Sequence, residues 1–188
     1  MAKILSDLTS TIIAGVVLAV VLVVVMFLWH GTGLDLDRNW WGFLFRWVHV
    51  LSGVMWIGIL WYFNFVQIPN MGKIPDEQKP AITGVIAPAA LFWFRWGAMA
   101  TIVTGLILAW LNGYFGQAVS LGIIEGSSSF HTAIGIGMWL GAIMWFNVWF
   151  IIWPNQKKAL GIVTVEADEK AKAGRTAMLF SRTNKTIL

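Results

Sequence analysis

The sequence contains no cysteine in its 188 residues. This absence excludes disulfides, thiolate catalysis, iron–sulfur ligation by cysteine and covalent attachment of a c-type haem within the chain. Charge is also scarce, since Asp, Glu, Lys and Arg make up 12% of the residues, against about 25% in soluble domains. The net charge of +4 gives no argument for nucleic-acid binding. No zinc-ligand spacing, phosphate-binding loop or nucleophile triad is present.

Long apolar runs dominate what is present. The chain is 58% hydrophobic and its mean hydropathy is +0.73. Four runs, over about 11–29, 41–66, 89–111 and 130–153, are each close to the roughly 20 residues that cross a bilayer. The first run has no convincing cleavage site, so we expect it to be retained. The sequence predicts an all-α, integral membrane four-helix bundle over 1–153, followed by a charged tail over 154–188 that is helical from about 165 to 180.

The distribution of Lys and Arg predicts how the bundle is oriented. The loop predicted over 112–129 has neither residue, whereas the loop predicted over 67–88 carries Lys73 and Lys79 and the tail carries many more. Positive residues in short flanks favour the cytoplasmic side. We therefore expect both termini in the cytoplasm of a bacterial cell, with the protein in its inner (plasma) membrane and the lipid bilayer as its first partner.

Two of the predicted helices resemble each other. Residues 46–70 read RWVHVLSGVMWIGILWYFNFVQIPN, and residues 131–155 read HTAIGIGMWLGAIMWFNVWFIIWPN. Each has a histidine, a glycine four residues later, then Met-Trp-x-Gly, an asparagine and a final Pro-Asn. The spacing from histidine to methionine is one residue longer in the second copy, which a π-bulge or a drift in register would explain. We interpret the pair as an internal repeat.

The repeat places His49 and His131 at matching positions of two helices that run in the same direction. Ionisable residues inside membrane helices are expensive and mark sites by default. Facing helices of bundles commonly hold cofactors, and one histidine from each helix suits the two axial positions of haem b. The expected haem site therefore consists of His49 and His131 as iron ligands, Gly53 and Gly135 as room for a flat ring, and Arg46 as partner of a propionate.

Each of these residues also has a purely structural interpretation. His49 could be a packing histidine that is hydrogen-bonded to a carbonyl, and His131 an interfacial histidine in the first turn of a helix. His30, the third histidine, is expected among the headgroups. The glycines could serve close helix packing alone. Arg95, within an aromatic cluster, is expected to extend towards the cytoplasmic interface, with an anionic ligand as its alternative.

Three segments carry a resemblance to a known family: RWVHVLSGVMWIG, FRWGAMATIVTGLILAW and HTAIGIGMWLGAIMWFNVWFIIWPNQKK. From about residue 38 onwards, including SRTNKTIL, the chain resembles the N-terminal membrane domain of the bacterial membrane-bound urate oxidase (urate hydroxylase) family, whose members typically add a C-terminal cytochrome c. The resemblance implies a redox protein that passes electrons towards a cytochrome c. The family's membrane domain is longer, so this chain is expected to be a shortened relative or part of a larger protein.

The function expected from the sequence is membrane electron transfer through a b-type haem, with other membrane subunits or a cytochrome c as partners. Two alternatives stay open. One is a haem-free accessory subunit of a larger respiratory or photosynthetic complex. The other is a urate-oxidising domain that requires partner segments, because we expect the isolated chain not to oxidise urate at an appreciable rate.

Overall fold

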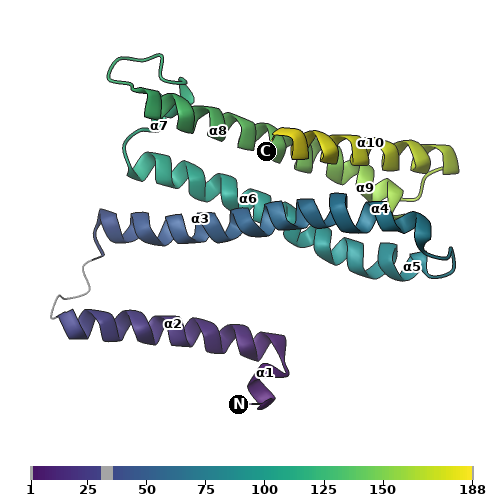
Figure 1. Cartoon of the computed structure of the whole chain (residues 1–188), viewed down its shortest axis with the longest axis horizontal. Helices are drawn as coiled ribbons and strands as arrows, with labels where there is room; N and C mark the ends of the chain where they lie inside the picture. Colours follow the sequence, from purple (N-terminus) through teal and green to yellow (C-terminus); the bar gives the residue numbers. More distant parts are fainter. Residues whose placement is uncertain (1, 31–35, 188) are drawn as a thin grey trace. The chain divides into compact units, whose positions relative to one another are not determined.

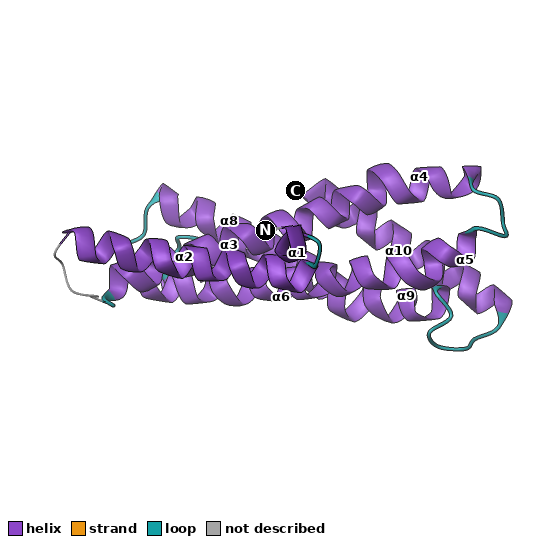
Figure 2. Cartoon of the chain, turned by 90° about the horizontal axis from the view of Figure 1, so that it is seen from below, coloured by secondary structure: helices purple, strands orange, loops and turns teal. Residues whose placement is uncertain are grey.

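The computed structural model describes residues 2–30 and 36–187, and every regular element in these ranges is a helix (Figure 2). The chain forms two compact units, one up to Trp41 and the other from Gly42 onwards. Four helical stretches are long and apolar enough to cross a bilayer: Leu8–Trp29, Arg38–Lys73, Lys79–Leu111 and Ser129–Ala159. The prediction of an all-α chain with four membrane-length helices is thus confirmed for the described residues.

The first unit contains the short helix α1 (Ala2–Leu5) and the long helix α2 (Leu8–His30), and it ends in the first turn of the helix that follows. Asp7 precedes α2, and its carboxylate accepts the backbone N–H of Ser10 at 2.8 Å, which satisfies one of the free donors at a helix start. Most side chains of α2 are exposed, as suits a helix of Val, Leu and Ile that faces lipid or another apolar surface. The sequence prediction begins this helix three residues later, at Thr11.

The second unit is built on three long helical stretches (Figure 1). The first comprises α3 (Arg38–Trp61), η1 (Tyr62–Gln67), α4 (Ile68–Asn70) and η2 (Met71–Lys73). The second comprises α5 (Lys79–Ala81), η3 (Ile82–Ile86) and α6 (Ala87–Leu111). The third comprises α8 (Ser129–Phe146), η4 (Asn147–Ile152) and α9 (Trp153–Ala159), and α7 (Phe115–Val119) precedes it. Asp37 starts α3 by accepting the N–H of Trp40 at 2.8 Å.

The predicted loop over 67–88 is wrong for most of its length, because helix continues to Lys73 and resumes at Lys79. Its prolines at 69, 80 and 88 lie in first turns, where a missing N–H costs nothing. In each long stretch a π-helical segment (η1, η3 or η4) ends two residues before a proline: Pro69, Pro88 and Pro154. A proline ring collides with the carbonyl four residues earlier, and a wider turn moves that carbonyl away.

The internal repeat is visible in these π-helical segments. η1 contains Asn64 and η4 begins at Asn147, the two asparagines that the repeat matches. After the proline, Asn70 donates to the Val66 carbonyl at 2.7 Å. Asn155 donates in the same way to the carbonyl of Ile151 at 2.8 Å. The π-bulge suggested between His131 and Met138 is not found, because α8 is regular α-helix there.

The charged tail folds back as helix α10 (Ala167–Ile187) and packs along α9, η4 and α8 (Figure 1). It is longer than the predicted helix over 165–180. Its buried face consists of Ala173, Ala177, Ser181 and Asn184. Residues 42–187 therefore share one core, and the tail helix contributes to it.

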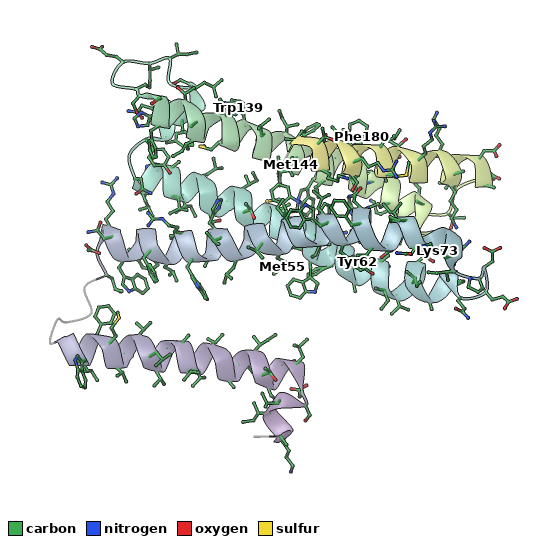
Figure 3. All side chains as sticks on the ribbon, in the orientation of Figure 1. Met55, Tyr62, Lys73, Trp139, Met144 and Phe180 are labelled. Atoms are coloured by element: carbon green, nitrogen blue, oxygen red, sulfur yellow. The ribbon has the colours of Figure 1, made fainter. Side chains whose placement is uncertain are left out.

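That core lies where α3, α6 and η4 meet α10. Its largest fully buried side chains include Phe94, Leu60 and Leu91. Met144 points from α8 into this crowded region, while Met55 points away on the other side of α3 (Figure 3). Gly97 allows α6 to approach α3, since a Cβ there would lie 3.4 Å from the backbone nitrogen of Trp56. This close contact fixes how far α3 and α6 are shifted along each other, and therefore which of their other side chains meet.

Candidate functional site

His49 lies on α3, two turns from the close crossing at Gly97, and its ring is held by α6. Its Nδ1 is 2.9 Å from the carbonyl oxygen of Thr101 and 3.1 Å from the hydroxyl oxygen of Thr104. A carbonyl can only accept, so Nδ1 carries the proton in this hydrogen bond. In the neutral ring Nε2 then has a free lone pair, which is the arrangement found in histidines that ligate metals.

Gly105 makes room for this ring. A Cβ at Gly105 would lie 3.0 Å from Cε1 of His49, which is tighter than ordinary contact. This role differs from the one expected of Gly53, which is to leave room for the haem ring itself. A methyl group at Gly53 would have no other atom within 4 Å, so that position faces open space beside α3.

A cavity of about 410 Å³ lies beside His49, between α3, α6 and α8. This volume falls within the range of small-molecule and cofactor sites. The lining is mostly apolar, and three of its residues are glycines. The lining residues are His49, Trp56, Thr101, Ile102, Gly105, Leu106, Leu108, Tyr114, Ile134, Gly137, Met138, Gly141 and Ala142. Two of its side chains, His49 and Met138, are of the types that most often bind haem iron.

His131 is placed differently from His49. It is the third residue of α8 and completes a capping box there, in which its Nδ1 accepts the backbone N–H of Ser128 at 2.9 Å. Because Nδ1 accepts, the proton of the neutral ring is on Nε2. Its ring neighbours are Tyr114 and Phe130. His131 does not line the cavity beside His49, and its geometry matches the first-turn alternative considered from the sequence.

The other predicted site residues are also apart from the cavity. The space beside Gly135 is filled by the carbonyl oxygen of Ala118, so this glycine permits the contact of α7 with α8. Arg46 lies one turn before His49 on α3 and is exposed. His30 is the last residue of α2, in the other compact unit. The geometry brings together His49, Gly105 and Met138 rather than the repeat-matched set.

A second cavity, of about 280 Å³, lies on the tail side of the core. α6, α9 and α10 contribute to its lining, with η1 and α4. Two amide oxygens, of Gln67 and Gln156, belong to lining residues and are buried without hydrogen-bond partners. Sequence reasoning does not find this cavity, because it exists only once the tail helix folds back.

The two repeat-matched asparagines hold the tail helix. Asn64 donates to the hydroxyl of Ser181 at 3.0 Å. Asn147 donates to the side-chain oxygen of Asn184 at 2.8 Å, and Asn184 donates in turn to the carbonyl of Met144 at 3.0 Å. The asparagines of the repeat thus serve docking of α10, not the cavity beside His49.

Comparison of the chain with protein-family models, with curated proteins and with solved structures finds no match in any of the three.

Proposed function

We propose that the protein is a membrane electron-transfer protein that binds a b-type haem in the cavity beside His49. The observation that carries the proposal is the hydrogen bond from Nδ1 of His49 to the Thr101 carbonyl. It orients the ring, fixes the tautomer and leaves Nε2 free to bind iron. A bound haem would supply one-electron exchange between ferric and ferrous iron.

The residues around the cavity fit a flat apolar ring better than a hydrated metal ion. Gly105, Gly137 and Gly141 line it without side chains, and Trp56 and the aliphatic residues give it an apolar wall. A metal ion held by a macrocycle needs only one or two protein ligands, and the oriented His49 can supply one of them. An apolar surround also limits access of water to the iron.

Two residues are candidates to hold the haem iron together with His49. His131 is the ligand expected from the repeat, but in the capping box its Nδ1 is engaged and its Nε2 is protonated. Met138 lines the same cavity as His49 from the facing helix α8, and its thioether could hold haem iron together with a histidine. The proposed pair is therefore His49 and Met138, with the His49–His131 pair as the alternative.

A reduced-minus-oxidised absorption spectrum of the purified protein tests this function. Wild-type protein is expected to show a low-spin b-type spectrum. His49→Ala should remove the haem, and Met138→Leu should give a high-spin, five-coordinate haem. His131→Ala and His30→Ala serve as matched controls and should keep the low-spin spectrum. Loss of that spectrum in His131→Ala, with Met138→Leu unaffected, would restore the repeat-matched pair. Absence of haem from wild-type protein would favour the accessory-subunit alternative.

The orientation is part of the same proposal. Both termini are cytoplasmic, so α8 begins at the outer face and the haem cavity lies in the outer half of the membrane. The support is the absence of Lys and Arg from 112–129 and their abundance in the tail. A cytochrome c or another membrane subunit at the outer face is the proposed acceptor of electrons.

Because the chain resembles the urate oxidase family, urate is a proposed source of electrons. We propose this only for the chain together with further protein segments. We expect no measurable loss of urate when this chain alone is supplied with an artificial electron acceptor. Urate-dependent reduction of the haem, measured by its absorption, separates the electron-transfer role from the role of a urate-oxidising domain.

A further inference from the structure

Arg95 on α6 carries a charge that is partly enclosed at the edge of the core. Its guanidinium carbon lies 3.4 Å from the centre of the Trp153 ring on α9. Its Nη1 is buried and has no hydrogen-bond partner. A buried charged donor without an acceptor is costly, so this atom points to an acceptor that the described residues do not supply.

The surroundings of Arg95 are rich in donors. The ion pairs found among the described residues, Lys79–Asp76 and Lys158–Glu169, involve neither Arg95 nor Lys157. The ammonium of Lys157 lies 5.7 Å from the centre of the same Trp153 ring. One turn before Trp153, the indole N–H of Trp149 is also buried without a partner. Two cations and an unpaired N–H together suit an anion with several oxygens.

The depth of this group matches a membrane surface. At about 1.5 Å per residue, Arg95 lies roughly 24 Å along α6 from its end at Leu111, and Trp153 lies roughly 36 Å from the start of α8 at Ser129. A hydrocarbon core is about 30 Å thick. The Arg95–Trp153 contact is therefore about one core thickness from the outer ends of these helices, at the level of inner headgroups.

Apolar surface continues from this group towards the membrane interior. Trp96 follows Arg95 on α6, on its outer side, and is 49% exposed. Trp96 also packs edge-on against Trp149, with ring centres 5.6 Å apart. An anion with attached acyl chains would place its phosphate at the two cations and its chains along these rings, whereas a free phosphate would use only the cations.

We propose that Arg95, Lys157 and Trp153 form a binding site for the phosphate of an anionic phospholipid in the inner leaflet. The site is separate from the cavity beside His49 and does not depend on haem, whereas its assignment to the inner leaflet rests on the proposed orientation. The lipid phosphate accepts from the guanidinium and the ammonium, and its acyl chains lie on Trp96 and Trp149.

Native mass spectrometry of the delipidated protein in mild detergent tests the proposal, with phosphatidylglycerol and phosphatidylcholine as the added lipids. Wild-type protein should bind one phosphatidylglycerol about tenfold more tightly than phosphatidylcholine. Arg95→Gln should abolish that preference, and Lys157→Gln should reduce it several-fold. Arg175→Gln, which removes an exposed arginine of α10, is the matched control and should behave as wild type.

Three results would overturn the assignment. Equal binding of the two lipids by wild-type protein would remove the headgroup preference. Equal effects of Arg95→Gln and Arg175→Gln would show that the preference for phosphatidylglycerol comes from the overall surface charge and not from a site at Arg95. Displacement of phosphatidylglycerol by an equal concentration of glycerol 1-phosphate would assign the site to a soluble phosphate ester. If Arg95→Gln loses its helical circular dichroism, two other variants test the lipid site. Arg95→Lys should keep the preference for phosphatidylglycerol, and Lys157→Gln should reduce it.

Discussion

At the scale of single residues, the two repeat-matched histidines differ in which ring nitrogen is free. His49 donates from Nδ1 to a carbonyl, whereas His131 accepts at Nδ1 from the backbone of Ser128. The sequence places both at the same point of the repeat, but a hydrogen-bond partner, not a position in a pattern, decides which nitrogen is available. Of these two histidines, His49 is the one that presents an unprotonated Nε2 beside a cavity.

Gly105→Ala tests the space that this ring requires. The added methyl would lie 3.0 Å from Cε1 of His49, so the ring must move and its bond to Thr101 must weaken. We expect haem affinity to fall by about tenfold, as when a ligand loses its orienting partner. Titration of the apoprotein with haemin measures it. Gly53→Ala is the control, because its methyl meets open space, and an equal loss in both variants would contradict the role of Gly105.

Asp7, ahead of α2, carries a prediction about pH. Hydrogen bonds from Ser10 lower the pKa of the Asp7 carboxyl below its ordinary value. A carboxyl with a depressed folded-state pKa stabilises the folded form above its unfolded pKa and loses that contribution as pH falls through the folded pKa. In a carboxyl carbon NMR titration, Ser10→Ala should therefore move the Asp7 midpoint upwards. An unchanged midpoint would show that the Ser10 side chain does not hold this carboxylate.

At the scale of elements, the tail helix α10 is docked through polar side chains rather than through an apolar stripe alone. Asn184 is fully buried and bridges Asn147 to the Met144 carbonyl. A buried amide with two partners specifies one register of the helix, because a shift along its axis would leave the side-chain amides of Asn147 and Asn184 unpaired.

Asn184→Ala should therefore loosen α10 more than any exposed substitution on it. Leaving the buried side-chain amide of Asn147 unpaired costs about 1–3 kcal/mol. Hydrogen exchange of the α10 amides should become faster, and the free energy of unfolding should fall. Thr183→Ala, next to it on the exposed face, removes only a bond to its own helix and should change stability by less than about 0.5 kcal/mol. Equal exchange in both variants would rule out docking by Asn184.

At the scale of the whole molecule, orientation is open to a direct test. The chain has no cysteine, so single cysteines report one position each. Glu125→Cys, in the exposed segment before α8, should react with an impermeant maleimide added outside cells. Lys172→Cys, exposed on α10, should react only after the membrane is opened. Reaction of both cysteines from the same side would exclude an odd number of crossings between them.

Much of the architecture could be predicted from the sequence, because apolar runs of the right length are a strong signal. The helical class and the four membrane-length helices follow from composition and run length. The extensions through Pro69 and Pro88 could not be predicted, since a proline usually ends a helix unless a wider turn precedes it. The docking of α10 could not be predicted either, because its buried face consists of small and polar residues, Ala173, Ala177, Ser181 and Asn184, rather than of large apolar ones.

The candidate site could be predicted only in part. His49 stands out in the sequence because an ionisable residue within an apolar run is unusual. Gly105 and Met138 do not, because their relation to His49 depends on the level at which α6 and α8 cross α3. Repeat symmetry also predicts Gly135 and His131 as site residues, but their neighbours are the Ala118 carbonyl and the Ser128 N–H.

The three wide turns before Pro69, Pro88 and Pro154 have a consequence for changes in chain length. A π-helical turn holds one residue more than an α-helical turn, so removing one residue from η4 would leave α8 and α9 in phase. The same deletion within α8 would rotate everything beyond it by about 100°. We expect a chain that lacks Phe150, which is 59% exposed, and carries Pro154→Ala, so that no wide turn is required, to keep its fold by circular dichroism and thermal unfolding. We expect a chain lacking Ile136 to lose it. These turns are thus the places where the helices can lose a residue without losing their alignment.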